Sequence, residues 1–438
     1  MTPLEIGAWS FPALLVLIFL RVPIGLAMFS TGFVGLFLVT GSTNLALARL
    51  KSESFTTFSN YSLSIVPMFL LMGYFATVGG MSQALFKAAE GFLGHRRGGV
   101  AMAAIGACAG FGAICGSSLA TAATMGRTAL PEMRRYGYSG GFSTATLAAG
   151  GTLGILIPPS VILVIYAILT EQNIAKLFLA ALAPGLLAAA GYMLTISIYV
   201  RLYPNAAGTK PPVPWAERFD ALWRVWPVLM VFLTVVGGIY GGIFTPTEGA
   251  AVGAMGTAII ALVKGGLTGR VLTEGLLSTA KTTGFIFFIV LGAAFYNGFL
   301  ALTRVPQELS AFVVDQGFAP MVVLCLILVF YLIFGCLMDS LSMILLTVPI
   351  FFPVISALDF GMTPEHVAIW FGILVLIVVE VGLITPPVGM NLFIINAMDK
   401  TTSMIDTYKS VLFFVASDIV RVIILVAFPG ITLFLIAP

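Results

Sequence analysis

Gly154-Ile155-Leu156-Ile157-Pro158-Pro159-Ser160 lies in the middle of an apolar run, and its adjacent prolines decide the fold. Each proline lacks an N–H donor and clashes with the preceding turn, so residues 144–170 cannot form one unbroken helix. In lipid, an unwound bend is tolerated only where it is packed in protein or lines a wet cavity. We therefore predict a broken helix here and a binding site at its bend.

The same device recurs in the second half of the chain, as Gly382-Leu383-Ile384-Thr385-Pro386-Pro387-Val388. Upstream of each bend lies a second similar pair, Gly112-Ala113-Ile114-Cys115-Gly116-Ser117-Ser118 and Gly335-Cys336-Leu337-Met338-Asp339-Ser340-Leu341. The offsets between the copies nearly agree, which indicates an internal duplication. Paired interruptions at matching positions of two halves point to the substrate site of a transporter.

Composition places the chain in a bilayer. Of its 438 residues, 59% are apolar and 9% charged, and the mean hydropathy is +1.08. The first apolar segment, residues 6–20, lacks a basic flank and a cleavage site, so we expect a retained span. The only histidines, His95 and His366, lie at predicted segment ends, which argues against a histidine-based metal or catalytic site. Basic patches with interleaved aromatics are absent, so nucleic acid is not an expected partner.

Charge predicts the topology, because Lys and Arg concentrate on the cytoplasmic side of membrane proteins. Most of the 21 Lys and Arg residues fall on one predicted side only if residues 98–136 and 320–358 are re-entrant hairpins. The flanking residues are Arg96, Arg97, Arg134 and Arg135 for the first hairpin and Asp315, Asp359 and Glu365 for the second. The first hairpin then enters from the cytoplasm and the second from outside, with both termini periplasmic.

The predicted fold class is an all-α polytopic membrane protein with an inverted-topology repeat, two re-entrant hairpins and two broken helices. Residues 1–203 form the first repeat, 204–224 a cytoplasmic linker and 225–438 the second repeat. The broken helices cover residues 144–170 and 366–397. A series of simple spans kinked at glycines is the alternative.

Interrupted helices expose unpaired carbonyl and N–H groups, which suit Na⁺ and an anion respectively. We place one Na⁺ between the first tip and the first bend, and a second between the second tip and the second bend. The first set is Gly116, Ser117, Ser118, Gly154 and Pro158, with Ser160 opening the next half-helix. The second set is Asp339, Ser340, Gly382, Thr385 and Pro386. A serine in a membrane helix also often bonds back to a carbonyl, and Asp339 is also a suitable helix N-cap.

Four further polar side chains stand out in the apolar segments. Glu380 precedes the second bend and is either a proton-sensing or ion-supporting group or a structural carboxylate. Asp418 and Arg421 have the spacing of an intrahelical pair, which we expect to stabilise packing. Asn391 follows the second bend and is a candidate substrate contact.

The residues that carry these features resemble the large membrane subunit of tripartite ATP-independent periplasmic (TRAP) transporters. The matching stretches, which together span most of the chain, are 116–123, 153–160, Thr245-Pro246-Thr247-Glu248-Gly249-Ala250, Met338-Asp339-Ser340 and Ile384-Thr385-Pro386-Pro387-Val388-Gly389-Met390-Asn391.

The resemblance implies a Na⁺-driven transporter of the elevator type, in which hairpins and broken helices move against a scaffold. It implies two or more coupling Na⁺ ions, no organic cofactor, an organic anion such as a carboxylate or sulfonate, and location in a bacterial or archaeal inner membrane. It also implies a small four-helix membrane subunit, here expected as a separate polypeptide, and a periplasmic substrate-binding protein. Substrate contacts would come from Ser118, Ser160 and Asp339.

Three other functions compete with this interpretation. One is a stand-alone Na⁺-coupled carboxylate symporter or Na⁺/H⁺ antiporter of the same architecture. A membrane hydrolase using Ser117 or Ser118 lacks a histidine or lysine base at membrane depth, so no catalytic residue is expected. A purely structural membrane component has no reason to keep duplicated unwound segments.

Overall fold

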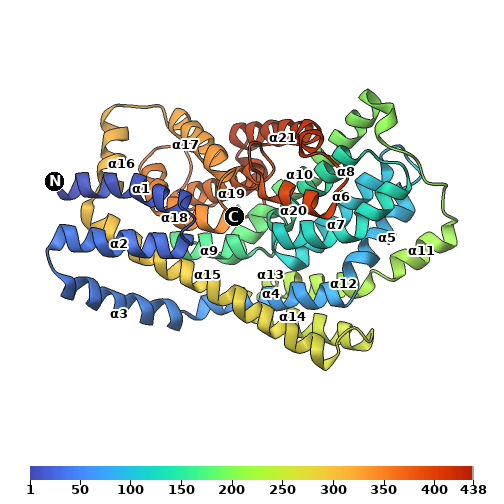
Figure 1. The fold of residues 1–438 in the computed structure, drawn as a ribbon, viewed down its shortest axis with the longest axis horizontal. Coiled ribbons are helices and arrows are strands. Elements are labelled where there is room, and N and C mark those ends of the chain that lie inside the picture. The colour runs from blue at the N-terminus through green and yellow to red at the C-terminus, as the bar shows by residue number, and fades with distance from the viewer. Residues whose placement is uncertain (437–438) are drawn as a thin grey trace.

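The computed structural model describes residues 1–436, and over these residues all regular secondary structure is helical. Seven helices are long and apolar enough to cross a membrane, or eight if the bent pair α8 and α9 counts as one span. The predicted all-α polytopic class is therefore confirmed. These helices lie roughly along the long axis of the molecule (Figure 1).

One group of helices comes from the beginning of each half. From the first half these are α1 (Pro3–Phe19), α2 (Ile24–Thr40), α3 (Thr43–Ser59) and α4 (Ile65–Val78). From the second half they are α12 (Trp226–Phe232), α13 (Gly238–Tyr240), α14 (Pro246–Val263) and α15 (Gly269–Thr303). Helix α15 packs along α2, and α14 packs along α4, so the two halves interlock.

Helices α6 (Gly99–Cys115) and α7 (Ser118–Arg135) form the first hairpin. The Val100 N–H, at the start of α6, donates a 3.1 Å hydrogen bond to the Tyr138 hydroxyl, just beyond α7. The segment therefore returns to the end from which it started.

Helices α17 (Pro320–Gly335) and α18 (Ser340–Ser356) form the second hairpin. The Thr347 hydroxyl donates to that of Tyr331 at 2.7 Å, and these residues lie equally far on either side of Asp339. The first hairpin lies to the right of the centre of Figure 1 and the second to the left. They approach the middle from opposite ends, as an inverted repeat requires.

Both proline pairs interrupt helices. Helices α8 (Gly140–Leu156) and α9 (Val161–Thr170) meet at a 45° bend, and α19 (Pro364–Gly382) is separated from α20 (Met390–Met398) by a non-helical stretch. The Pro158–Pro159 and Pro386–Pro387 peptide bonds are both cis. Each interruption lies inside the protein, because residues 153–157 and 381–384 are buried.

The remaining helices close the structure. They are α5 (Met81–Leu93), α10 (Ile174–Leu202), α11 (Trp215–Trp223), α16 (Val305–Asp315), α21 (Met404–Ala427) and the short α22 (Gly430–Leu433). Part of the predicted linker is helical, since α11 lies within it and packs on α5. A 3.0 Å ion pair between Lys210 and Glu90 also fastens the linker to α5.

Candidate functional site

The two hairpin tips line one cavity of about 340 Å³. Gly116, Ser117 and Ser118 come from the first tip, and Asp339, Ser340 and Leu341 from the second. The other lining residues are Leu70, Leu119, Ile155, Val161, Ile162, Thr282, Phe285, Ile286, Leu383 and Met390. Since Ile155 and Leu383 precede the two proline pairs, the cavity is where all four interrupted segments converge.

A helix begins at each hairpin tip. Gly116 ends α6 with φ +62°, a left-handed conformation that glycine adopts without strain. Ser117 then caps α7, accepting from the Ala120 N–H at 3.4 Å. Asp339 caps α18, accepting from the N–H of Ser342 at 3.0 Å and from its hydroxyl at 2.5 Å. The positive ends of α7 and α18 are thus both at the cavity.

At equivalent positions of the two halves, a pair of glycines lets each hairpin pack closely against its own broken helix. A Cβ added to Gly112 would lie 2.7 Å from the Cα of Gly154, and one added to Gly382 would lie 2.7 Å from the Cα of Gly335. Real Cβ atoms do not approach so closely, so only glycine fits at these crossings. The aligned motifs of the two halves therefore make the same contact in three dimensions.

Buried oxygens without hydrogen-bond partners gather near this site. Among residues 1–436, the Thr121 hydroxyl, Oε2 of Glu380 and Oδ1 of Asn391 are such atoms. Thr121 and the Ser117 carbonyl both border Gly154, because a Cβ there would meet both, the carbonyl oxygen at 2.6 Å. Unpaired buried oxygens are costly, and carbonyls at broken helices are typical Na⁺ ligands, so the chemistry of these donors fits Na⁺.

Several residues predicted for the site lie beside the cavity and not in its lining. Ser160 is fully buried and caps α9, accepting from the Leu163 N–H at 3.4 Å. Thr385 bonds back to the Val381 carbonyl at 2.6 Å, so its hydroxyl is already paired within its own segment. Asn391 donates to the Ala148 carbonyl at 3.3 Å, which joins the second broken helix to the first.

Other site residues were not predicted from the sequence. Thr282, Phe285 and Ile286 form the wall contributed by α15, and Leu70 comes from α4. Nothing in the apolar pattern of these helices separates a cavity wall from any other packed face. Thr121 lies in the stretch 116–123, but the sequence does not indicate a role for it, because its approach to Gly154 depends on how α7 packs against α8.

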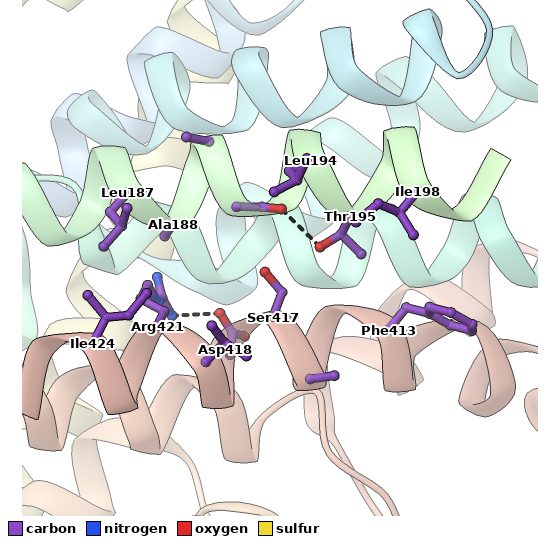
Figure 2. A pocket seen from close by; sticks show the side chains of 14 residues that line it. Leu187, Ala188, Leu194, Thr195, Ile198, Phe413, Ser417, Asp418, Arg421 and Ile424 are labelled. Atoms are coloured by element: carbon purple, nitrogen blue, oxygen red, sulfur yellow. Dashed lines mark hydrogen bonds and ion pairs between the residues drawn. The ribbon is translucent and has the colours of Figure 1, made fainter. Parts of the chain in front are cut away.

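A second cavity of about 510 Å³ lies between α10 and α21, away from the hairpin tips (Figure 2). Its walls are mostly apolar, and Asp418 and Arg421 lie on the α21 side, 2.7 Å apart. The predicted pair is confirmed. Asp418 also accepts from the Tyr192 hydroxyl at 2.8 Å, which fastens α21 to α10. None of the predicted sodium or substrate residues lines this cavity.

Comparisons with known proteins identify similar chains. Residues 11–431 match the family model described as "Tripartite ATP-independent periplasmic transporter, DctM component". The C4-dicarboxylate TRAP transporter large permease of Pseudomonas aeruginosa is 38% identical over 81% of each chain. The ectoine TRAP transporter large permease of Halomonas elongata is 30% identical over 96% of each. The YdaH transporter of Alcanivorax borkumensis has a similar fold, with a TM-score of 0.65 over 98% of both chains at 14% identity.

Proposed function

This chain belongs to the DctM family of TRAP transporter large permeases, and on that premise we propose that it takes up a small organic anion together with Na⁺. The family consists of multi-pass membrane permeases and not enzymes. It also implies two partners, a small membrane subunit and a periplasmic binding protein. The proposal concerns the coupling ion, the class of substrate and the movement.

The convergence of both hairpin tips on one cavity is the observation that carries the proposal. The N-terminal ends of α7 and α18 bring unpaired N–H groups there, and these favour a carboxylate or sulfonate. A volume of about 340 Å³ suits a small molecule. Ser118 and Asp339 border this space directly, whereas Ser160 and Asn391 act on the substrate through the helices that they hold.

We assign one Na⁺ to the oxygens around Ser117, Thr121 and Gly154, with Gly116, Ser118 and Pro158 shaping the site. A second Na⁺ is assigned beside Asp339 and Ser340, with Gly382, Thr385 and Pro386 across from them. The support is the buried Thr121 hydroxyl, which has no hydrogen-bond partner in the described part of the chain, at the first position and the Asp339 carboxylate at the second. A cation bound next to each tip neutralises the negative charge of the carbonyl and carboxylate oxygens there. It therefore favours binding of an anion between the two tips.

The two sides of the cavity suggest how substrate would cross. Hairpins and bends form one side, and α4 and α15 form the other. Helix α15 is fixed by its long contact with α2, so we assign it to the scaffold. An elevator movement would carry the tips along α15 while both Na⁺ sites stay intact. With the first hairpin entering from the cytoplasmic side, both termini of the chain are periplasmic.

Reconstitution tests the proposal. The purified permease and its small subunit are placed in proteoliposomes, and uptake of a ¹⁴C-labelled C4-dicarboxylate and other small organic anions is measured with the cognate binding protein outside. We expect uptake only with an inward Na⁺ gradient and only with the binding protein. Equal uptake in K⁺ medium would refute Na⁺ coupling. Uptake without the binding protein would favour a stand-alone symporter.

A further inference from the structure

A third cavity, of about 540 Å³, shares no lining residue with the cavity at the hairpin tips and lies where the linker meets α4, α5, α12 and α14. It differs from the others in having three cationic side chains in its lining, Lys87, Arg224 and Lys264. Two tryptophans, Trp223 and Trp226, also line it. The full set is completed by Val78, Gly79, Gly80, Gln83, Ala84 and Pro227.

Two of these cations are not neutralised by the protein. Arg224 pairs with Asp220 at 2.9 Å, but over residues 1–436 neither Lys87 nor Lys264 has a carboxylate within ion-pair distance. The three come from different elements, namely α5, the end of α11 and the end of α14. Three segments distant in sequence thus bring positive charge to one space, which favours an anionic ligand of the size of a phosphate group.

The surroundings of this cavity are those of a membrane interface. The side chains of Trp223 and Trp226 are 73% and 50% exposed, and tryptophan is enriched at the level of lipid headgroups. Exposed apolar residues continue from the cavity along α12 and the end of α14. They are Leu229, Met230, Leu262 and Val263. A ligand here therefore has apolar protein surface beside its charged end, as a phospholipid requires.

Helices α5 and α12, which line this cavity, lie toward the end of the molecule that holds α11 and the open end of the first hairpin, at the right of Figure 1. The excess of Lys and Arg assigns this end to the cytoplasm. The cytoplasmic leaflet carries anionic lipids, and basic pockets between helices on that side are suited to their headgroups. The cationic side chains, the two tryptophans and the cytoplasmic position of this cavity therefore all favour an anionic lipid as its ligand.

We propose that this cavity binds the phosphate headgroup of an anionic phospholipid. Lys87 and Lys264 contact the phosphate, Arg224 shares it with Asp220, and the tryptophans lie beside the glycerol backbone. One bound lipid would then tie the linker to both halves of the protein. The proposal does not depend on the transported substrate or on Na⁺.

Native mass spectrometry of the permease with its small subunit tests this directly. The probes are phosphatidylglycerol, phosphatidylcholine and the soluble glycerol 1-phosphate. We expect tighter binding of phosphatidylglycerol than of phosphatidylcholine, and a roughly 30-fold loss of phosphatidylglycerol affinity in the Lys87→Gln/Lys264→Gln variant. The charge-matched Arg201→Gln/Lys281→Gln variant, altered outside the cavity, should bind as the wild type does. Lys87→Arg/Lys264→Arg should retain binding.

Two outcomes would overturn the proposal. One is equal phosphatidylglycerol binding by the wild type and the Lys87→Gln/Lys264→Gln variant. The other is glycerol 1-phosphate binding as tightly as the lipid, which would mean a site for free phosphate. All three double substitutions are at exposed side chains, so a normal gel-filtration profile is expected and shows that any loss of binding is local.

Discussion

The hydroxyl of Ser340 donates a 2.6 Å hydrogen bond to Oε1 of Glu380, joining the tip of the second hairpin to the helix that precedes the second bend. Both residues are buried, and the other carboxylate oxygen has no partner among the described residues. The Ser118 side chain, from the first tip, lies near the same carboxylate. One acidic group therefore lies next to both hairpin tips of the candidate site.

Glu380→Gln removes the charge of this group and keeps an oxygen for the Ser340 hydroxyl. We expect the Na⁺ concentration for half-maximal uptake to rise about tenfold, equivalent to about 1.4 kcal/mol, because a nearby carboxylate favours cations. Ser340→Ala leaves the Glu380 charge in place, so it should change the Na⁺ concentration for half-maximal uptake less. The measurement is uptake against Na⁺ concentration in proteoliposomes. An unaltered Na⁺ dependence in Glu380→Gln would assign the residue a purely structural role.

Asp339 has two separable properties, its helix cap and its charge. Asparagine caps helices about as well as aspartate, whereas alanine forfeits about 1 kcal/mol. We expect Asp339→Asn to retain the wild-type melting temperature but to lose at least about tenfold in Na⁺-driven uptake. Asp339→Ala should melt at a lower temperature and also lose uptake. Thermal unfolding in detergent and uptake assays check this. Normal uptake by Asp339→Asn would show that Na⁺ coupling does not need the negative charge of Asp339.

Thr121→Val replaces a buried hydroxyl that has no hydrogen-bond partner among residues 1–436 by a methyl group of similar size. Without Na⁺, stability should stay equal or rise, because a buried unpaired hydroxyl costs about 1 to 3 kcal/mol. The stabilisation that Na⁺ gives to the wild type should shrink, since a ligand is lost. Thr152→Val is the control. That hydroxyl bonds to Ala149 and Tyr192, so its loss should lower stability and leave the Na⁺ effect unchanged.

Gly154→Ala and Gly382→Ala test the two helix crossings. Each added methyl group would meet backbone atoms of the neighbouring hairpin, and the hairpin would have to move. We expect uptake to fall below about a tenth of wild type in both, a cost of at least about 1.4 kcal/mol. Gly284→Ala, in α15, is the matched control, because a Cβ there would meet no atom within 4 Å. Full activity of both crossing variants would show that close approach is not needed.

Asp399 fixes the end of α20 to the end of α7 by accepting from Arg134, Thr401 and Thr402. Burial raises the pKa of this carboxyl, but hydrogen bonds from the two threonines and the Arg134 charge outweigh it, and the net pKa is lowered from 3.8. Its stabilising effect is thus complete above pH 3.8 and is lost as the pH falls through the lower folded-state pKa.

Asp399→Asn should therefore unfold at a lower temperature than the wild type at neutral pH, with a loss of about 1 to 2 kcal/mol. The difference should stay constant from pH 8 to about pH 5 and narrow only below the ordinary pKa of aspartate. Melting curves across this range measure it. If the difference in stability between the wild type and Asp399→Asn grew as the pH fell, the lowered pKa of Asp399 would be contradicted.

The sequence by itself determined the two halves and where each is interrupted. The proline pairs at Pro158 and Pro386 remove two adjacent N–H donors and so interrupt a helix, and Ser117 and Asp339 are capping residues after a break, so these predictions depended only on local chemistry. The pairing of Asp418 with Arg421 was also local, since residues three apart on a helix share a face.

Only the tertiary structure decided which polar groups meet. Thr385 and Ser160 had the right composition for a site, but their hydroxyls pair with backbone groups of their own segments, and neither residue lines the cavity. Thr121, Glu380 and the α15 wall joined the site because helices far apart in sequence cross there. The basic cavity of Lys87 and Lys264 has the same origin. Spacing along a chain reports which residues share a helix, whereas contacts between helices depend on the packing of whole surfaces, which no short motif contains.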